Sequence, residues 1–391
     1  MRQNTLQAVA IFVIAFLIRS IAAIATTLTT LNPDSTADAI GFGDTAETIA
    51  HGLKNGEPYL YTSESIDLSQ FLIPLISSDI YTLWGTFLAP FWLLPGPSGF
   101  YARLGNAFLG AFAVYNVYLI ARYYHSHQAG VIASIPVMFY PSIVATHSTL
   151  LREAIVLFAI TTATRLLVIQ SHRQSQYISY AFATALLHVA LLMREENIFI
   201  YAAGIGTAIV VYGIKTDIIS KRTAKLSTLL SPAILILSLP VIRDGIELLA
   251  YIRKARGHGR AVYLPEVIPQ TPFELITFSW IGAAYFLYAP FPWMIETIPD
   301  FLVSAEGIAT LGFTIAAAWG IRSLARKSAP VAAGLTVGIL VAVLSYGVGT
   351  VNYGTGMRHR QMFSWVIYLF GGIGVSEIVH FESLVASISE Q

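Results

Sequence analysis

Long apolar runs separated by short polar segments recur along the whole of this chain. Most have close to the 20 residues that an α-helix needs to cross the hydrocarbon core of a bilayer. One further apolar stretch, 275–293, contains Pro290 and Pro292, and we expect it to be re-entrant or to lie in the membrane interface. The pattern predicts about eleven spans, at residues 7–29, 72–95, 100–122, 129–147, 151–170, 177–193, 197–214, 227–243, 302–320, 329–348 and 361–379.

This pattern predicts an all-α fold, a polytopic transmembrane helical bundle that forms a single integral membrane domain over residues 1–391. Lys and Arg gather in cytoplasmic loops, and here they follow several spans, as at Arg122 and at Lys215–Lys225. With those loops inside, segments 32–70 and 244–301 become extracytoplasmic loops. The first of these is expected to carry short amphipathic helices.

Composition supports the membrane assignment. Hydrophobic residues make up 55% of the chain and charged residues only 12%, against about 25% charge in soluble domains. We therefore expect a multi-pass protein of the plasma membrane, with membrane lipids around it. The net charge of +1 implies no attraction to nucleic acid. The absence of cysteine excludes disulfides, thiolate metal sites and cysteine nucleophiles.

The segment from Asn32 to Gln70 is unusual because it holds seven acidic residues and one base, Lys54. Within it, Phe42, Ala46, Ile49 and Leu53 recur at helical spacing, which predicts an amphipathic helix over 38–52. Asp38 lies one turn before Phe42 on the same face and would point toward the membrane. Loss of water there raises the pKa of a carboxyl group and suits it to act as a base.

A structural reading of these acids stays open. Ser35-x-x-Asp38 and Asp44-x-x-Glu47 both have the spacing of a capping box, and Gly52 resembles the glycine that follows a helix. Asp44 therefore fits either an N-cap or a catalytic role. The acidic segment could also hold a divalent cation, although no metal motif of recognisable spacing is present.

Further charged residues fall on the same predicted outer face. Glu153 opens the span at 151–170, and Arg194 ends the span at 177–193. Arg256, Arg358 and Arg360 add guanidinium groups, which bind phosphates in a bidentate manner. Anchoring to lipid headgroups is the alternative for each arginine. Arg19, inside the first span, is expected to face the bundle interior because a charge at that depth is costly.

The motif Asp38-x-x-x-Phe42-x-x-x-Ala46-x-x-Ile49-x-x-Gly52 resembles the first outer loop of GT-C membrane glycosyltransferases. The similar branch uses polyprenyl- or dolichyl-phosphate sugars and includes the protein mannosyltransferases and the lipid A aminoarabinose transferases (family 39-like). The chain departs from that pattern at position 39, which is Ala where a second acid is usual. Other similar pieces follow in the same order: Arg19, Tyr101-Ala-Arg103-Leu-Gly-Asn106, Leu151-Arg152-Glu153-Ala, Arg194 and Arg358-His359-Arg360.

The resemblance implies an inverting transfer of a sugar from a polyprenyl-phosphate donor to a lipid, glycan or protein acceptor. It implies Asp38 as the base, Glu153 as an aid to the acceptor, and Arg194, Arg358 or Arg360 on the phosphate. Arg103 is expected to be structural. Two other classes stay open: a lipid-linked polysaccharide polymerase or ligase, which would rely on Arg and His, and a transporter or flippase, which would place ionisable groups on broken helices.

Overall fold

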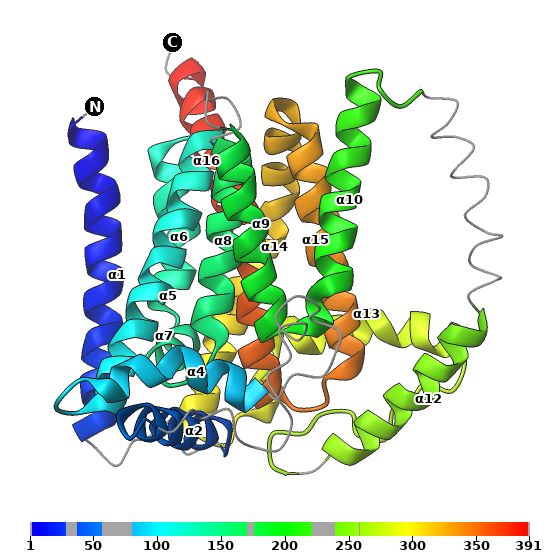
Figure 1. The fold of residues 1–391 in the computed structure, drawn as a ribbon. Helices are drawn as coiled ribbons and strands as arrows, with labels where there is room; N and C mark the ends of the chain where they lie inside the picture. The colour runs from blue at the N-terminus through cyan, green and yellow to red at the C-terminus, as the bar shows by residue number, and fades with distance from the viewer. Residues whose placement is uncertain are drawn as a thin grey trace. The chain divides into compact units, whose positions relative to one another are not determined.

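The computed structural model describes residues 2–28, 37–56, 80–169, 176–220, 239–257 and 259–389. These residues form helices and the segments between them, with one isolated antiparallel bridge between Val262 and Asn352 (Figure 1). The all-helical class predicted from the apolar runs is confirmed for this part of the chain.

Seven of the described helices are long and apolar enough to cross a membrane, so the chain is a multi-pass helical membrane protein by the length and composition of its helices. Each coincides with a span that the sequence predicts. They are Thr5–Leu28, Ser98–Tyr124, Gln176–Met193, Glu195–Lys215, Ile298–Lys327, Ala329–Gly349 and Tyr353–Val379.

The other four predicted spans are not confirmed. Segment 129–147 forms two helices, α6 (His127–Phe139) and α7 (Pro141–His147), with a bend of 65° between them. Segment 151–170 forms α8 (Glu153–Ile169), whose 17 residues are at the lower limit for a span. The described part of 72–95 is the 14-residue α4 (Ile80–Leu93). Most of 227–243 lies outside the described residues.

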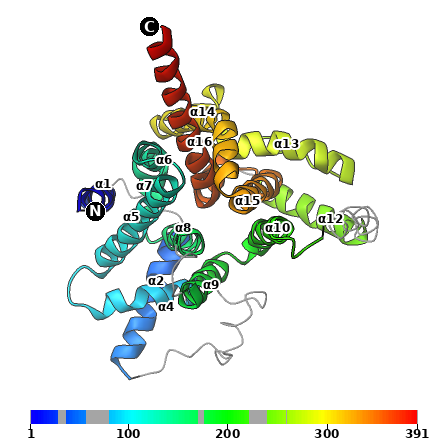
Figure 2. The ribbon, with the colours of Figure 1, turned by 90° about the horizontal axis from the view of Figure 1, so that it is seen from above.

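The contacts within the chain divide it into two compact units, residues 1–198 and 199–391. Whether they form the single domain that the sequence predicts stays a prediction. In the first unit, α1 (Arg2–Leu28) packs on α5 (Ser98–Tyr124), α5 on α8, and α8 on α9 (Gln176–Met193). Helices α2 (Ala37–Lys54) and α4 lie across the direction of α1, α8 and α9 at one end of this unit (Figures 1 and 2).

Helix α2 confirms the amphipathic helix predicted at 38–52. Its buried face carries Phe42, Ala46 and Ile49, as the spacing predicts. Leu53, the fourth residue of the predicted face, is 54% exposed at the end of the helix. The helix packs closely on α4, where a side chain at Gly85 would collide with Thr45 of α2. Its place on a membrane surface stays a prediction.

The capping interpretation of this segment is wrong at Asp44 and Gly52, since both lie inside α2. The helix continues because Ile49 and Ala50 pack on Ala89 of α4, and Lys54 Nζ donates to Trp92 O at 2.8 Å. The glycine that follows the helix is Gly56, with φ +70°. Ser35 lies outside the described residues.

Arg19 is fully buried and repairs the break between α6 and α7. In an unbroken helix, the carbonyl of Val137 would accept a hydrogen bond from the N–H of residue 141. That residue is Pro141, which has no N–H. The Arg19 Nη2 donates to Val137 O at 2.5 Å instead, and Nη1 donates to Ala15 O at 3.1 Å.

This arrangement predicts that Arg19 and Pro141 are energetically coupled. Arg19→Leu leaves Val137 O without that donor and should lower the free energy of unfolding by about 1–3 kcal/mol. Pro141→Ala returns an N–H to position 141, so the same arginine change should cost less in that background. Unfolding midpoints in detergent micelles give the four values of the cycle. If Arg19→Leu lowers the free energy of unfolding equally with Pro or Ala at position 141, the hydrogen bond from Arg19 to Val137 O does not stabilise the break.

In the second unit, α10 (Ile198–Lys215), α14 (Ile298–Lys327), α15 (Ala329–Gly349) and α16 (Tyr353–Ser389) contain the long apolar helices. Helices α14 and α16 approach closely because Gly320 and Gly374 have no side chain to collide with the facing backbone. Helix α13 (Pro272–Tyr288) lies across the direction of α10 and α15 in Figure 2. It ends before the cis Ala289–Pro290 bond.

Helix α12 (Leu239–Arg256) lies mostly in the predicted outer loop 244–301, together with α13 and the 3-10 helix η3 (Pro292–Met294). That loop is therefore largely helical. A re-entrant course for 275–293 stays a prediction, because α13 has 17 residues and no membrane is placed around it.

Candidate functional site

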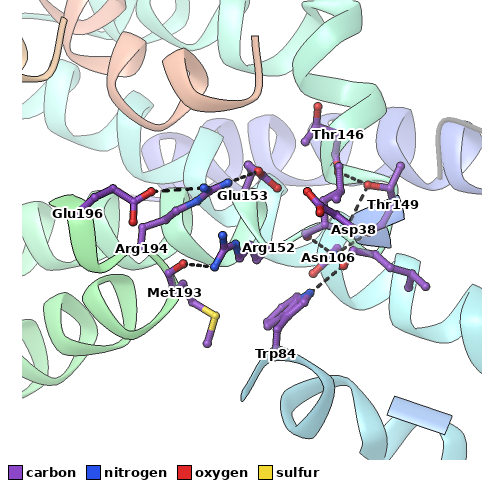
Figure 3. Close-up of polar contacts among 12 residues, drawn as sticks. Asp38, Trp84, Asn106, Thr146, Thr149, Arg152, Glu153, Met193, Arg194 and Glu196 are labelled. Atoms are coloured by element: carbon purple, nitrogen blue, oxygen red, sulfur yellow. Dashed lines mark hydrogen bonds and ion pairs between the residues drawn. The ribbon is translucent and has the colours of Figure 1, made fainter. Parts of the chain in front are cut away.

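The turn 148–152 between α7 and α8 is fixed by side chains from two other helices (Figure 3). Asn106 of α5 is buried, and its Nδ2 donates to Thr149 O at 2.6 Å and to Leu151 O at 2.8 Å. Trp84 of α4 donates from Nε1 to Leu150 O at 2.7 Å. Because three successive carbonyls are held, the residues that follow the turn are placed accurately.

Glu153 follows this turn as the first residue of α8 and is fully buried. Its Oε1 accepts a hydrogen bond from Arg194 Nη2 at 2.7 Å, and Arg194 is 6% exposed. Arg194 Nη1 also lies 3.4 Å from Glu196 Oε1, at the start of the short 3-10 helix η2 (Glu195–Asn197). The sequence thus named both members of a buried ion pair without predicting that they pair.

Arg152 ties the same region to α9. Its Nη1 donates to Met193 O, the last carbonyl of that helix, at 2.6 Å. The final carbonyls of a helix have no partner within it, and a cation there also interacts favourably with the helix dipole. Arg152 therefore holds the end of α9, and Arg194 directly after it, against the start of α8.

Asp38 lies in the first turn of α2, at the same end of the unit. Its side chain is half-buried, and Tyr81 of α4 donates its hydroxyl to Asp38 Oδ1 at 3.1 Å. The Tyr81 ring also packs on Phe42, with 4.9 Å between ring centroids. Leu150 of the turn contacts α2 at Gly43, and Figure 3 draws Asp38 in the same close-up as Glu153 and Arg194.

The other acids of the first loop are placed differently. Asp44 and Glu47 are exposed on α2, whereas Asp38 and Phe42 share the face turned toward Tyr81. Asp34, Glu57, Glu64 and Asp67 lie outside the described residues. In the part of the chain that the structure describes, no three His, Asp or Glu side chains are grouped to share a metal ion. A divalent cation at this loop stays a prediction.

Arg103 and Arg19 differ in burial although the sequence grouped them as structural. Arg103 is half-buried, and its Nη1 donates to Thr27 Oγ1 at 2.8 Å, which joins α5 to the end of α1. Arg19 is fully buried and lies beside His147, since a side chain at Gly110 would meet both.

The three arginines predicted near the C-terminal half of the chain, Arg256, Arg358 and Arg360, belong to the second unit and have different surroundings. Arg360 is 7% exposed, and its Nη1 donates to Leu287 O at 2.9 Å and Ala289 O at 2.8 Å. These carbonyls lie where Pro290 and Pro292 end α13. Arg256 is exposed and Arg358 is half-buried. The contacts of Arg360 support a structural role more than the predicted contact with a donor phosphate.

Arg253 belongs to the basic cluster Arg253–Arg260, which the sequence predicts around an outer pocket, but it is fully buried. Its guanidinium donates to four backbone carbonyls, of Leu264, Val267, Val348 and Thr350, at 2.6–3.4 Å. Burial lowers the pKa of Arg253. The sequence signal is helical spacing, since Arg253 shares one helix face with Ile246, which is also buried.

The turn beside Glu153 gives a prediction. Asn106→Leu keeps the side-chain shape but removes both donors to Thr149 O and Leu151 O. Each buried carbonyl left unpaired costs about 1–3 kcal/mol, so we expect a clear loss of stability. The unfolding midpoint in micelles measures it. A wild-type midpoint for Asn106→Leu would contradict this role of the turn.

Comparison of the chain with models of protein families, with curated proteins and with solved structures gave no match.

Proposed function

We propose that this chain transfers a sugar from a polyprenyl-phosphate donor to an acceptor at the membrane surface, with Asp38 as the base. The observation that carries the proposal is the half-buried Asp38 carboxylate, at the same end of the first unit as the buried Glu153–Arg194 pair. A polyprenyl chain keeps its donor in the bilayer, so the reacting phosphate is found where membrane helices end.

Asp38 is suited to take a proton from an acceptor hydroxyl. Partial burial keeps bulk water from one side of the carboxylate, and the Tyr81 hydroxyl holds Oδ1 in a fixed direction. A base positioned in this way contributes about 10²–10⁴-fold to a rate. Asp44 is the weaker candidate, because it is exposed on another face of α2.

In this proposal Glu153 and Arg194 are both positioning residues, because both are buried and bonded to each other; contact of Glu153 with the acceptor stays a prediction from the sequence. Arg194 already contacts two carboxylates, of Glu153 and Glu196, so a phosphate would have to compete with both. The assignment of Arg256 and Arg358 to the donor phosphate stays a prediction from the sequence.

The orientation that the sequence predicts, with Arg122 in a cytoplasmic loop, makes the Asp38 end extracytoplasmic. Arg122 is in the last turn of α5, at the end of this unit opposite to α2 and α4 (Figure 1). The basic residues at the Asp38 end, Lys54, Arg103, Arg152 and Arg194, all bind helix ends or acidic side chains. The plasma membrane is the location proposed for a donor of this kind.

One observation favours a transporter or flippase as a second candidate. Helices α6 and α7 form a bent pair, beside the buried Arg19 and His147. Broken helices near interior charges are typical of transporters. The repair of the break by Arg19 accounts for the same features without transport, so the transferase remains the first proposal.

The deciding experiment uses the purified chain in proteoliposomes with radiolabelled polyprenyl-phosphate sugars and a membrane extract as the source of acceptors. We expect label to move from the lipid donor to an acceptor. No transfer, together with lipid-dependent flux of label across the vesicle membrane, would favour the transporter. Transfer that persists in Asp38→Asn would favour a polymerase or ligase that relies on Arg and His.

A further inference from the structure

The segment between α13 and α14, in the second unit, presents a pair of stacked aromatic rings. Trp293 is 75% exposed and stacks on Phe291, with 4.8 Å between centroids and 10° between the ring planes. Tyr285 packs edge-on against Phe291 at 5.0 Å and stacks on the buried Tyr263. The exposed indole is thus held by a series of ring contacts that ends at a buried tyrosine.

Arg260 lies beside the same segment and is held in one orientation. Its Nη1 and Nη2 donate to the two oxygens of the buried Asp300, at 2.6 and 3.3 Å, and Nη1 also donates to the Tyr353 hydroxyl at 3.0 Å. The hydrogen bond with Asp300 raises the pKa of Arg260. The segment that follows Arg260 is held in place by two backbone hydrogen bonds, from Tyr263 N to Val351 O and from Tyr353 N to Ala261 O.

One edge of this guanidinium is left for a ligand. The end-on contact with Asp300 and the contact with Tyr353 use three of its five N–H groups. Among the described residues, Nε and one hydrogen of Nη2 make no hydrogen bond, and these two lie on one edge of the planar group. The Arg260 side chain is 47% exposed. It therefore presents a rigid pair of donors to solvent.

The local charge decides which ligand suits this edge. Glu296 Oε2 lies 3.6 Å from Arg260 Nη1, and the Glu296 side chain is 61% exposed. With Asp300 and Glu296 beside one arginine, the cluster carries a net charge of about −1. A phosphate would be repelled by it, whereas neighbouring sugar hydroxyls can accept from the guanidinium and donate to the Glu296 carboxylate.

The geometry points to a subsite for a neutral sugar ring, formed by the Trp293 indole as a stacking surface with Arg260 and Glu296 as hydrogen-bonding groups. Binding of the sugar is inferred from these residues alone. That the sugar is part of a substrate rests on the proposed function. The apolar face of a pyranose would lie on the indole, and its hydroxyls would face the two charged side chains.

The test measures binding of soluble oligosaccharides of mannose, glucose and galactose to the full-length protein in detergent micelles, by saturation-transfer NMR. We expect saturable binding of at least one of them. Trp293→Ala should weaken it at least tenfold, and Arg260→Lys, which keeps the charge but loses the paired donors, at least fivefold. Trp319→Ala removes an indole that is 50% exposed within α14 and should leave binding unchanged.

Several outcomes would overturn the inference: no binding of any of these sugars, equal binding by Trp293→Ala, or displacement of the sugar by inorganic phosphate. A fourth is quenching by brominated lipid acyl chains in nanodiscs of the part of the fluorescence that Trp293→Ala removes, which would make the indole a membrane anchor. Asp38→Asn should bind the sugar as wild type does. Sugar binding without transfer would thus contradict the proposed function alone, and transfer without sugar binding would contradict this inference alone.

Discussion

Glu153→Met is expected to lower the free energy of unfolding by about 3–5 kcal/mol. The variant keeps an unbranched side chain of similar length but leaves the Arg194 guanidinium, 6% exposed, without its nearest counter-charge. The loss reflects an uncompensated buried charge more than the attraction between the two groups. Glu196, with a side chain 48% exposed and 3.4 Å away, is too solvated to replace Glu153. Unfolding midpoints in micelles measure the change.

The double variant Glu153→Met/Arg194→Met provides the control. Replacing both members of a buried pair by apolar residues of similar size is often neutral or stabilising, so the double variant should be more stable than either single variant. If the double variant is the least stable of the three, the attraction between the two charges itself stabilises the fold, and the explanation by an uncompensated charge is wrong.

Asp38→Asn is expected to reduce the initial rate of sugar transfer by about 10²–10⁴-fold. The amide matches the carboxylate in shape and can still accept a hydrogen bond from Tyr81, but it cannot take a proton at neutral pH. Folding should be unchanged, because Tyr81 and Phe42 keep their contacts. The rate is measured in proteoliposomes at saturating donor, with equal amounts of inserted protein.

Glu47→Gln is the matched control for this variant. It removes a carboxylate from the same helix, but from the exposed side, and should leave the rate within about twofold of wild type. A large loss in Glu47→Gln would mean that the charge of the whole segment matters and that no single acid acts as the base.

The sequence predicted where apolar helices form more reliably than how they lie. Phe42, Ala46 and Ile49 face inward on α2 as their spacing requires, because the helical period is local information. Segment 72–95 was expected to span, yet its described part, α4, lies across the direction of α1, α8 and α9 of the same unit (Figure 2). Apolar composition is similar in both orientations, so only packing on α2 distinguishes them.

The arginines show a second limit. The sequence predicted Arg19 as an interior charge and Arg360 as a phosphate ligand, and for neither did it predict a backbone partner within the chain. Arg19 donates to a carbonyl that a proline leaves without its helical donor, and Arg360 donates to carbonyls at the end of a helix. Pro141 and Pro290 are visible in the sequence. Which distant arginine meets each break depends on contacts between remote segments, as with Arg19 and Val137, and spacing along the chain carries no such information.

The most direct test of the account compares the initial transfer rates of Asp38→Asn and Asp44→Asn in the same proteoliposomes. Both variants remove one carboxylate from α2, and they differ in the face that loses it. If Asp38 is the base, the Asp38→Asn rate should be less than about one hundredth of the Asp44→Asn rate. An Asp38→Asn rate equal to or above that of Asp44→Asn would contradict the account.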